Sequence, residues 1–406
     1  MKLIRVTKSS PRNDRNWTRI AADVRMASGE TFEIFYEVSS RLEAALSDSG
    51  NPWIVAMLPY ALSTGEDVEC NLPVDARLLE NLEGLLATWI DWYPQFRRPR
   101  LVAPREPFGS DEGFESRTAV FFSGGIDSWF SVLRHAPELE PAAIGMVDDL
   151  LTVHGFDIPL ERPQEFATLE AALAEGARAL DRELVVVRTN LRRPDTLWAR
   201  AWGWLTHGAG LASVALVLER RFGRAVIGST HPYGGLIPWG SHPMTDALLS
   251  TRRLDVRHDG AQYARTDKTA LVARHPVALS HLHVCWKNAA AHNCGVCAKC
   301  LRTMATLEVL GALDPINPFP ARLDAAALAN VYLENDNEVE FFTEVRALAH
   351  ARGNRSIEHA IDTAMRRSRR WRPLIDAADR MHNVPLLWRA APAMRRWCNG
   401  VGAASQ

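Results

Sequence analysis

The stretch that decides the fold is Ala119-Val120-Phe121-Phe122-Ser123-Gly124-Gly125-Ile126-Asp127-Ser128. Its first four residues form an apolar run that predicts a buried strand, and a turn with two glycines follows that run directly. Beyond the turn, Trp129, Phe130, Val132 and Leu133 continue an apolar helical pattern. Because a glycine turn between a strand and a helix lets backbone amides approach an anion closely, the stretch predicts a phosphate site.

Each polar side chain of this loop has an expected role. The carboxylate of Asp127 would hold Mg²⁺, and the hydroxyls of Ser123 and Ser128 would donate to phosphate oxygens. The stretch points to cleavage of ATP between its α and β phosphates, and it is distinct from the Walker pattern Gly-x-x-x-x-Gly-Lys-Ser/Thr. An ordinary turn followed by an N-cap has a similar composition but lacks this context. The residues expected to bind ATP are Phe122, Ser123, Gly124, Gly125, Ile126, Asp127 and Ser128.

Length and composition bound the class of protein. The chain has 406 residues, of which 47% are hydrophobic and 23% are charged, as in globular proteins with two or three domains. A formal net charge of −1 provides no global attraction to nucleic acid or to anionic lipid. Since no apolar run reaches the ~20 residues that a bilayer requires and no signal-peptide pattern opens the chain, we expect a cytoplasmic protein with no membrane partner.

Three regions are expected along the chain. Residues 1–115 are typical of a small N-terminal α/β domain, with a strand at 31–39 and a helix capped by Asp75. A stretch rich in proline, glycine and charge leads from it into the nucleotide-binding region at 116–312. Residues 313–406 are expected to form a helical C-terminal extension.

The nucleotide-binding region alternates strands with helices. Strands are expected at 119–122, 142–147, 184–187 and 225–228. Helices are expected at 128–135, 165–180 and 199–222. Such alternation requires crossover connections, so the sequence predicts an α/β fold whose doubly wound parallel sheet carries helices on both faces.

A second motif consists of four clustered cysteines. They are Cys285, Cys294, Cys297 and Cys300, whereas Cys70 and Cys398 are isolated. In a reducing compartment such clustering indicates a metal site, and four thiolates can close the tetrahedron of a structural zinc ion. An iron–sulfur cluster is the rival interpretation, because Cys-x2-Cys-x2-Cys is also a ferredoxin-like spacing. The cations Lys287, Lys299 and Arg302 would offset the negative charge of a zinc tetrathiolate.

Two further groups of residues have both a functional and a structural interpretation. The arginine run Arg366, Arg367, Arg369, Arg370 and Arg372 is either a docking face for RNA or a partner, or a solvated helix end, which we favour. The histidines His154, His207, His231 and His242 fall where a doubly wound sheet brings loops toward its active edge. Each of them alone is more commonly structural.

Together, the loop and the cysteine cluster resemble the QueC-like family of PP-loop ATP pyrophosphatases, the 7-cyano-7-deazaguanine synthases. The likeness covers roughly residues 117–312 and rests on Phe-Ser-Gly-Gly-x-Asp-Ser at 122–128 and on the spacing of the four cysteines. The turn at 225–230 and the pair Asp267-Lys268 also fit the family. The resemblance implies a sheet of the PP-loop or HUP type, similar to the adenine nucleotide α hydrolases.

The resemblance implies a reaction as well. ATP would adenylate 7-carboxy-7-deazaguanine or a related heterocyclic carboxylate with release of pyrophosphate, and an amine would then displace AMP. Ammonia would give an amide, which a second ATP would activate to reach the nitrile, whereas a protein N-terminus would give a conjugate. Asp127 and Ser128 would act at the phosphates, and Lys268 would stabilise charge on the α phosphate. The implied cofactors are ATP, Mg²⁺ and a structural Zn²⁺.

The chain departs from QueC where that family forms its base pocket. The Pro-Gly-Arg-Asn and Tyr-Pro-Asp-Cys segments are absent, and residues 204–208 and 238–243 stand near those places. The added regions 1–115 and 313–406 resemble the extended QatC-like subgroup of bacterial antiphage defence. We therefore expect ATP and a small carboxylate as partners, with a protein acceptor as an option, tRNA disfavoured and homo-oligomers left open.

Two other functions remain open. A PP-loop tRNA thiolase would need an iron–sulfur cluster or a redox cysteine and would bind tRNA through residues 366–372. A non-catalytic nucleotide-binding scaffold would have no need for a Mg²⁺ ligand such as Asp127.

Overall fold

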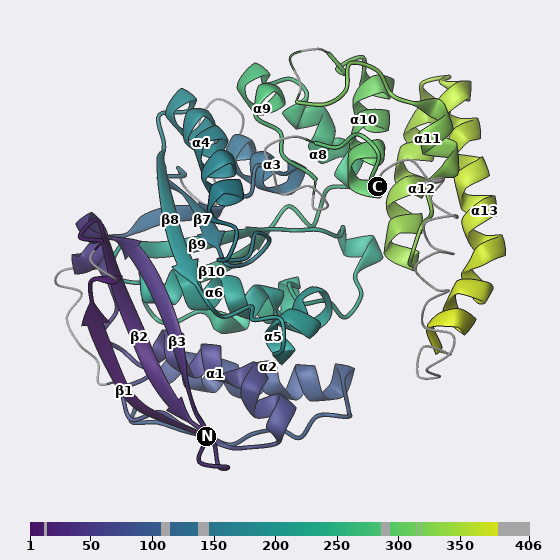
Figure 1. Ribbon diagram of the computed structural model, residues 1–406. Coiled ribbons are helices and arrows are strands. Elements are labelled where there is room, and N and C mark those ends of the chain that lie inside the picture. Colours follow the sequence, from purple (N-terminus) through teal and green to yellow (C-terminus); the bar gives the residue numbers. More distant parts are fainter. Residues whose placement is uncertain are drawn as a thin grey trace. The chain divides into compact units, whose positions relative to one another are not determined.

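The computed structural model describes residues 1–11, 14–106, 114–136, 146–285, 293–314, 316 and 318–380, the last seven of them as backbone only (Figure 1). The strands are β1 Lys2–Ser9, β2 Trp17–Arg25, β3 Thr31–Ser39, β4 Val68–Glu69, β5 Leu101–Val102, β6 Arg117–Phe121, β7 Asp149–His154, β8 Glu183–Thr189, β9 Phe222–Gly228 and β10 Asp255–Asp259. The helices are α1 Asn51–Thr64, α2 Ala76–Trp92, α3 Ile126–Arg134, α4 Pro163–Ala179, α5 Leu197–Arg200, α6 His207–Val217, α7 Pro243–Asp246, α8 Arg265–Val272, α9 Pro276–Ser280, α10 Ala298–Leu310, α11 Ala325–Asn330, α12 Asp336–Ala351 and α13 Arg355–Arg380.

All ten strands belong to one sheet, in the order β10-β9-β6-β7-β8-β3-β2-β1-β4-β5. The five strands from β10 to β8 are mutually parallel. If these five are counted along the chain from β6, their spatial order from β8 to β10 is 3-2-1-4-5, as in a Rossmann-like sheet. The chain therefore has an α/β fold with a mostly parallel sheet.

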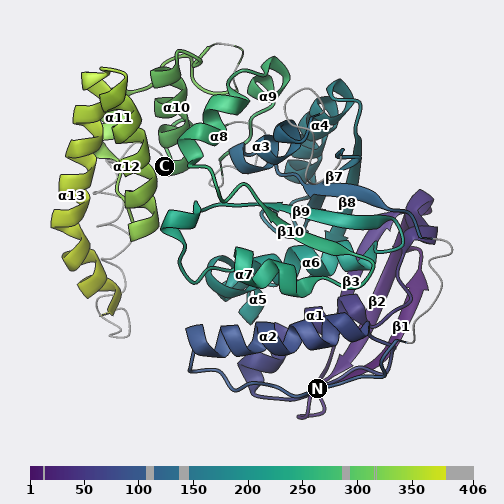
Figure 2. The same ribbon diagram turned by 180° about the vertical axis from the view of Figure 1, so that it is seen from behind.

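Helices cover both faces of the parallel strands. In Figure 1, α3 and α4 lie on one face, while α1 and α6 lie on the other. Seen from behind, β9 and β10 lie side by side above α6 and α7 (Figure 2). Side chains alternate between these layers, so that Ala119 and Phe121 join the core formed with α1 and α6 while Val120, between them, points to the opposite face. Such two-sided burial explains the apolar runs in β6, β7, β8 and β9.

Most elements expected in this region are confirmed, with two differences. The strand expected at 142–147 falls largely within residues 137–145, which lie outside the described residues. The strand that pairs with β6 is β7, which starts at Asp149, seven residues after the expected start. The single helix expected at 199–222 is instead divided into α5, a π-helical turn at Trp202–Thr206 and α6. Gly203, Gly208 and Gly210 lower the helix propensity of this stretch, and large indole rings crowd two of these positions.

The N-terminal strands do not form a sheet of their own. Strand β3 pairs antiparallel with β8, with Tyr36 opposite Thr189, and β2, β1, β4 and β5 continue the sheet outward. Residues 1–123 and 127–263 accordingly form one compact unit. The boundary expected near residue 115 follows from a composition change, which carries no information on whether strands pair across it.

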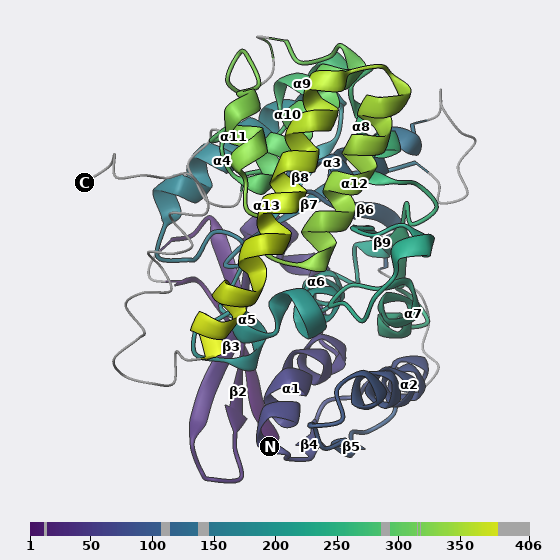
Figure 3. The ribbon, with the colours of Figure 1, turned by 90° about the vertical axis from the view of Figure 1, so that its right-hand side faces the viewer.

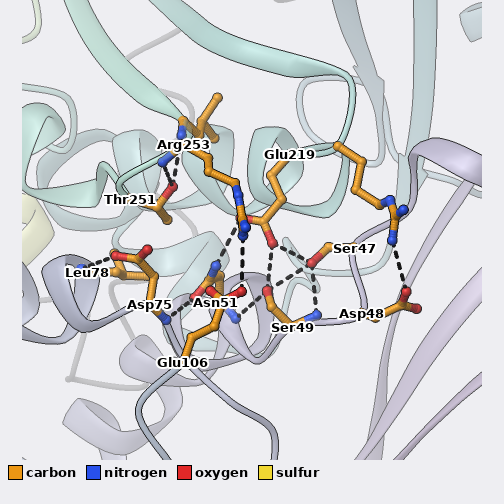
Figure 4. Close-up of polar contacts among 12 residues, drawn as sticks. Ser47, Asp48, Ser49, Asn51, Asp75, Leu78, Glu106, Glu219, Thr251 and Arg253 are labelled. Carbon is orange, nitrogen blue, oxygen red and sulfur yellow. Dashed lines mark hydrogen bonds and ion pairs between the residues drawn. The ribbon is translucent and has the colours of Figure 1, made fainter. Parts of the chain in front are cut away.

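A buried carboxylate helps to join these two parts of the first unit (Figure 4). Glu219, just before β9, accepts hydrogen bonds from Ser47 Oγ at 2.5 Å, Ser49 Oγ at 2.6 Å and Asn51 Nδ2 at 2.9 Å. Burial raises the pKa of Glu219, and the three hydrogen bonds oppose that rise. Asp75 caps α2 as expected, accepting from Leu78 N at 3.1 Å.

The second compact unit contains residues 124–126 and the described residues from 264 to 380. Its apolar core joins α10, α11, α12 and α13 through residues such as Leu301, Leu328, Phe342 and Ile361. Figure 3 shows α11 and α12 beside the long helix α13. The expected helical extension is thus present up to residue 380. Among the described helices, none has both the length and the apolar character needed to cross a membrane.

Candidate nucleotide loop and metal centre

The glycine loop lies at the topological switch point of the parallel sheet. Strands β6 and β9 are neighbours, yet the chain proceeds from β6 toward β7 and from β9 toward β10, in opposite directions across the sheet. In open α/β sheets, ligands bind outside the carboxyl ends of the strands at such a point. The loop that follows Phe121 therefore occupies the position where this fold places a ligand.

The backbone of the loop requires glycine. Phe122 is buried, and its N–H extends the pairing of β6 by donating to the carbonyl of Leu151 at 2.8 Å. Gly124 has φ of 77°, a left-handed conformation that costs side-chain-bearing residues energy. Helix α3 then begins at Ile126, so Asp127 and Ser128 lie in its first turn while Ser123 is exposed before it. The predicted loop, turn and helix start are all present.

Glycine is also required on the neighbouring strand. A Cβ built on Gly228, the last residue of β9, would stand 2.9 Å from the carbonyl oxygen of Asp127. Beyond it, Ser229 N donates to the carbonyl of Asp259 at 2.7 Å, and Ser229 Oγ donates to the carbonyl of His231 at 2.6 Å. The ends of β9 and β10 are therefore fixed together beside the first turn of α3.

Asp259, at the end of β10, anchors the second half of α3. Its carboxylate accepts from Ser131 Oγ at 2.8 Å and lies 3.2 Å from both Arg134 Nη1 and His135 Nε2. Burial by itself would raise the pKa of Asp259, but the contact with His135 and the charge of Arg134 hold it below its ordinary value. Asp259 could not be predicted from the sequence, because β10 has the sequence Asp-Val-Arg-His-Asp and offers no apolar run to mark a strand end.

Lys268 is 1% exposed and lies on α8. It belongs to the second unit, whereas Asp127 and Ser128 belong to the first. The first turn of α8 is held by Glu344 of α12, whose carboxylate accepts from Arg265 N at 3.0 Å. Burial of a lysine requires that polar partners match the charge of its ammonium group.

The four cysteines converge in the second unit. Their sulfur atoms all lie within 4.8 Å of one another, and Cys294 Sγ and Cys300 Sγ are 3.9 Å apart. A tetrahedral zinc site with Zn–S distances of about 2.3 Å has sulfurs about 3.8 Å apart, so the donor set fits zinc. Cys285, Cys297 and Cys300 are buried and Cys294 is partly exposed. The structure therefore supports a metal-binding site at the predicted residues.

Backbone groups shape the thiol cluster. Cys297 N donates to Cys294 Sγ at 3.3 Å, and Cys300 N donates to Cys297 Sγ at 3.5 Å as α10 begins. Hydrogen bonds from the Cys300 thiol and backbone lower the pKa of Cys297, despite burial. Gly295 has φ of 70°, and its missing Cβ leaves room for the ring of Pro320. Amides directed at sulfur stabilise thiolates, the form that binds metal.

Asn293, which was not predicted from the sequence, joins the segments that flank the cluster. Its Oδ1 accepts from Val284 N at 2.8 Å and from Cys285 N at 3.1 Å. Its Nδ2 donates to the carbonyls of Leu282 and Pro318 at 2.9 and 3.0 Å. Of the cations expected nearby, Arg302 is buried with its guanidinium 4.2 Å from the ring centre of Phe341, and Lys287 lies outside the described residues.

The two segments that depart from the QueC pattern meet in the first unit. Gly240 N donates to the carbonyl of Gly203 at 2.8 Å, and Gly208 N donates to the carbonyl of Gly240 at 2.6 Å. Next to them the buried carboxylate of Asp246 accepts from Ser241 Oγ at 2.6 Å and from His258 Nδ1 at 2.8 Å. These contacts fix 239–242 against the π-helical turn.

The four histidines singled out in the sequence have different surroundings. His207, His231 and His242 pack edge-on against the indoles of Trp202, Trp239 and Trp92 respectively. His154 instead stacks on Phe166, and its Nε2 lies 3.0 Å from the carbonyl of Pro159. The structural interpretation accounts for His154, while the other three lie among aromatic side chains of the first unit.

No protein-family model matches the chain, and comparisons with curated proteins and with solved structures find no similar protein.

Proposed function

We propose that this protein uses ATP to adenylate a carboxylate and then passes the acyl group to an amine, as the PP-loop enzymes of the QueC-like family do. The observation that carries the proposal is the position of the glycine loop: it follows β6 at the switch point and places Asp127 and Ser128 in the first turn of α3. A helix N-terminus and a glycine at positive φ form an anion site, and Asp127 supplies the oxygen ligand that Mg²⁺ prefers.

The chemistry needs a good leaving group. A carboxylate oxygen attacks the α phosphorus of ATP, and the bond between the α phosphorus and the oxygen that bridges to the β phosphate breaks. Pyrophosphate then leaves and carries the negative charge that develops on that oxygen. The amides of the loop and the first turn of α3 would stabilise that charge, and Ser128 Oγ would donate to a phosphate oxygen. Bound Mg²⁺ supplies charge neutralisation at the phosphates, held through Asp127. An amine then attacks the acyl carbon and AMP departs.

The cysteine cluster is assigned a structural zinc ion in this proposal. Four thiolates leave no open position for water or substrate, as is usual for structural sites. The same proposal gives Lys268 a role at the α phosphate. The burial of the Lys268 side chain on α8 supports this role.

The acyl donor and acceptor follow the family resemblance. We propose 7-carboxy-7-deazaguanine or a related heterocyclic carboxylate as donor, and ammonia or a protein N-terminus as acceptor, the latter in a QatC-like antiphage system in the cytoplasm. Because the segments at 204–208 and 238–243 depart from the QueC pattern, the proposal includes related heterocyclic carboxylates beside 7-carboxy-7-deazaguanine.

The test is product analysis with purified protein, ATP and Mg²⁺. With 7-carboxy-7-deazaguanine as donor and ammonium as acceptor, AMP and pyrophosphate should form in equal amounts, whereas Asp127→Asn should lower their formation at least ~100-fold. Asp48→Asn removes an exposed carboxylate elsewhere in the same unit and should leave the rate unchanged. Formation of ADP and phosphate, or of no product with any heterocyclic carboxylate, would contradict the proposal.

A tRNA thiolase is the alternative with the same loop. It would show iron and a visible absorption band in place of zinc, together with sulfur transfer to tRNA. A nucleotide-binding scaffold would bind ATP without turnover, and Asp127→Asn would then change nothing but affinity. Metal analysis and product analysis on the same preparation separate the three functions.

A further inference from the structure

The arginine run of α13 separates into two groups with different surroundings. Arg367 donates to Asn330 of α11, and Arg372 Nη1 donates to Asp336 of α12 at 2.5 Å. These two arginines fasten α13 to its neighbouring helices. Arg366, Arg369 and Arg370 are exposed. The run is therefore neither a uniform docking face nor simply a solvated helix end.

The three exposed arginines share one face of the helix. Positions 366, 369 and 370 are three and four residues apart, the spacing that places side chains together on a helix surface. Arg355 is exposed on the same side, about 20 Å away along the axis at 1.5 Å per residue. The opposite side of α13 is buried, and its core residues are Ile357, Ala360, Ile361 and Ala364. We call Arg366, Arg369 and Arg370 the outer arginines.

Acidic groups along this face already have basic partners. Asp362 lies 2.6 Å from Arg346 Nε, and Glu358 lies 3.1 Å from Arg355 Nη1 and 2.9 Å from His350 Nδ1. Over residues 355–373 the sequence holds six arginines against these two carboxylates. Among the described residues, no acidic group forms an ion pair with the outer arginines. The turn of α13 that contains these arginines therefore carries a local positive charge.

The geometry distinguishes between kinds of anionic partner. Single-stranded nucleic acid is held by aromatic side chains that stack on bases between basic groups. The one aromatic side chain of the run, Trp371, is only partly exposed, and the guanidinium of Arg370 lies 5.9 Å from its ring centre. Proteins that bind duplex DNA and lose affinity steeply with salt make about 6–10 phosphate contacts, roughly twice or more what one turn with three arginines supplies. Guanidinium groups bind carboxylates bidentately, so three neighbouring arginines suit the carboxylates of a short acidic segment.

We propose that the outer arginines dock an acidic segment of a partner protein. The surface is independent of the proposed ligase activity, because it uses no residue of the loop or of the metal centre. Exposed charged groups such as the outer arginines accelerate association with a partner of opposite charge and give specificity. Both effects weaken as the salt concentration rises.

The chain offers a matched control for the test. Arg97, Arg98 and Arg100 are also three exposed arginines within four residues, but each is paired, with Asp67, Glu83 and Asp67 respectively. Replacing either group by glutamine changes the net charge of the protein equally. The probe is a fluorescein-labelled peptide of alternating glutamate and glycine, followed by fluorescence anisotropy at low and at physiological salt.

We expect the full chain to bind this peptide, with affinity falling as salt is added. Arg366→Gln/Arg369→Gln/Arg370→Gln should weaken binding at least ~10-fold, while Arg97→Gln/Arg98→Gln/Arg100→Gln should stay within about twofold. The single variants Arg369→Gln and Arg370→Gln should each give a partial loss, which keeps the test valid if the triple variant unfolds. Equal losses in both triples, no binding at low salt, or tighter binding of duplex DNA through the outer arginines would overturn the proposal.

Discussion

Gly228 lies directly against the backbone of Asp127. A Cβ at Gly228 would stand 2.9 Å from the Asp127 carbonyl oxygen and 3.3 Å from its Cβ, closer than side-chain carbons approach such atoms. The last residue of β9 therefore sets how near the first turn of α3 comes to the end of the neighbouring strand. A residue outside the glycine loop thus controls the position of the proposed Mg²⁺ ligand.

Substitution of Gly228 by alanine should damage activity more than stability. The added methyl group forces the first turn of α3 to move by several tenths of an ångström, and a small displacement of a group that positions substrate is costly. We expect Gly228→Ala to lower the rate of AMP formation on the order of 10- to 100-fold. Product analysis gives the rate, and thermal unfolding of the same sample gives the stability.

Gly234→Ala is the matched control for this prediction. Gly234 follows the same strand, has no heavy atom within 4 Å of the place that an added methyl group would occupy and does not need a positive φ. Both the activity and the stability of this variant should resemble those of the unaltered protein. If Gly228→Ala retained full activity, the first turn of α3 would not be part of the reaction site.

The carboxylate of Asp259 should stabilise the fold in a pH-dependent way. Because its pKa is lower in the folded protein than in the unfolded chain, its contribution is present above the unfolded value of about 3.9 and is lost as pH falls through the folded value. Asp259→Asn leaves Arg134 without this buried charge partner and should cost about 3 kcal/mol at pH 7. Urea unfolding should show this difference at pH 7 and a much smaller one near pH 3. A constant difference across that range would exclude the carboxylate charge as its cause.

The sequence predicts the loop and the thiol cluster well because both depend on local order. Gly124 and Gly295 are needed for backbone conformations that their immediate neighbours determine. By contrast, the pairing of Tyr36 with Thr189 joins strands far apart in the chain, and no periodicity of either strand specifies its partner. Asn293 was missed for the same reason, since its four hydrogen bonds depend on how two segments meet.

The buried carboxyl of Glu219 should have the opposite pH dependence to that of Asp259. Burial raises its folded pKa above the unfolded value, so the folded state binds a proton more tightly and stability falls as pH rises above about 4.3. Glu219→Gln keeps the shape and a carbonyl acceptor while removing the charge. The free energy of unfolding of Glu219→Gln, relative to that of the unaltered protein, should increase from pH 5 to pH 8. Urea unfolding at both pH values measures this difference. Parallel stability curves for the two proteins would show that Glu219 does not titrate differently on folding.

Removal of one thiolate should release the metal and destabilise the second unit. A structural zinc ion binds only when the ligand set is complete, and its binding free energy contributes directly to folding. Purified protein should contain about one zinc ion per chain, and Cys297→Ser should lose it together with cooperative unfolding of α10. Elemental analysis measures the metal, and Cys70→Ala, which removes a buried thiol of the first unit, should retain it. A Cys297→Ser protein that kept both its metal and its thermal stability would contradict a structural role, and stoichiometric iron would instead favour the thiolase.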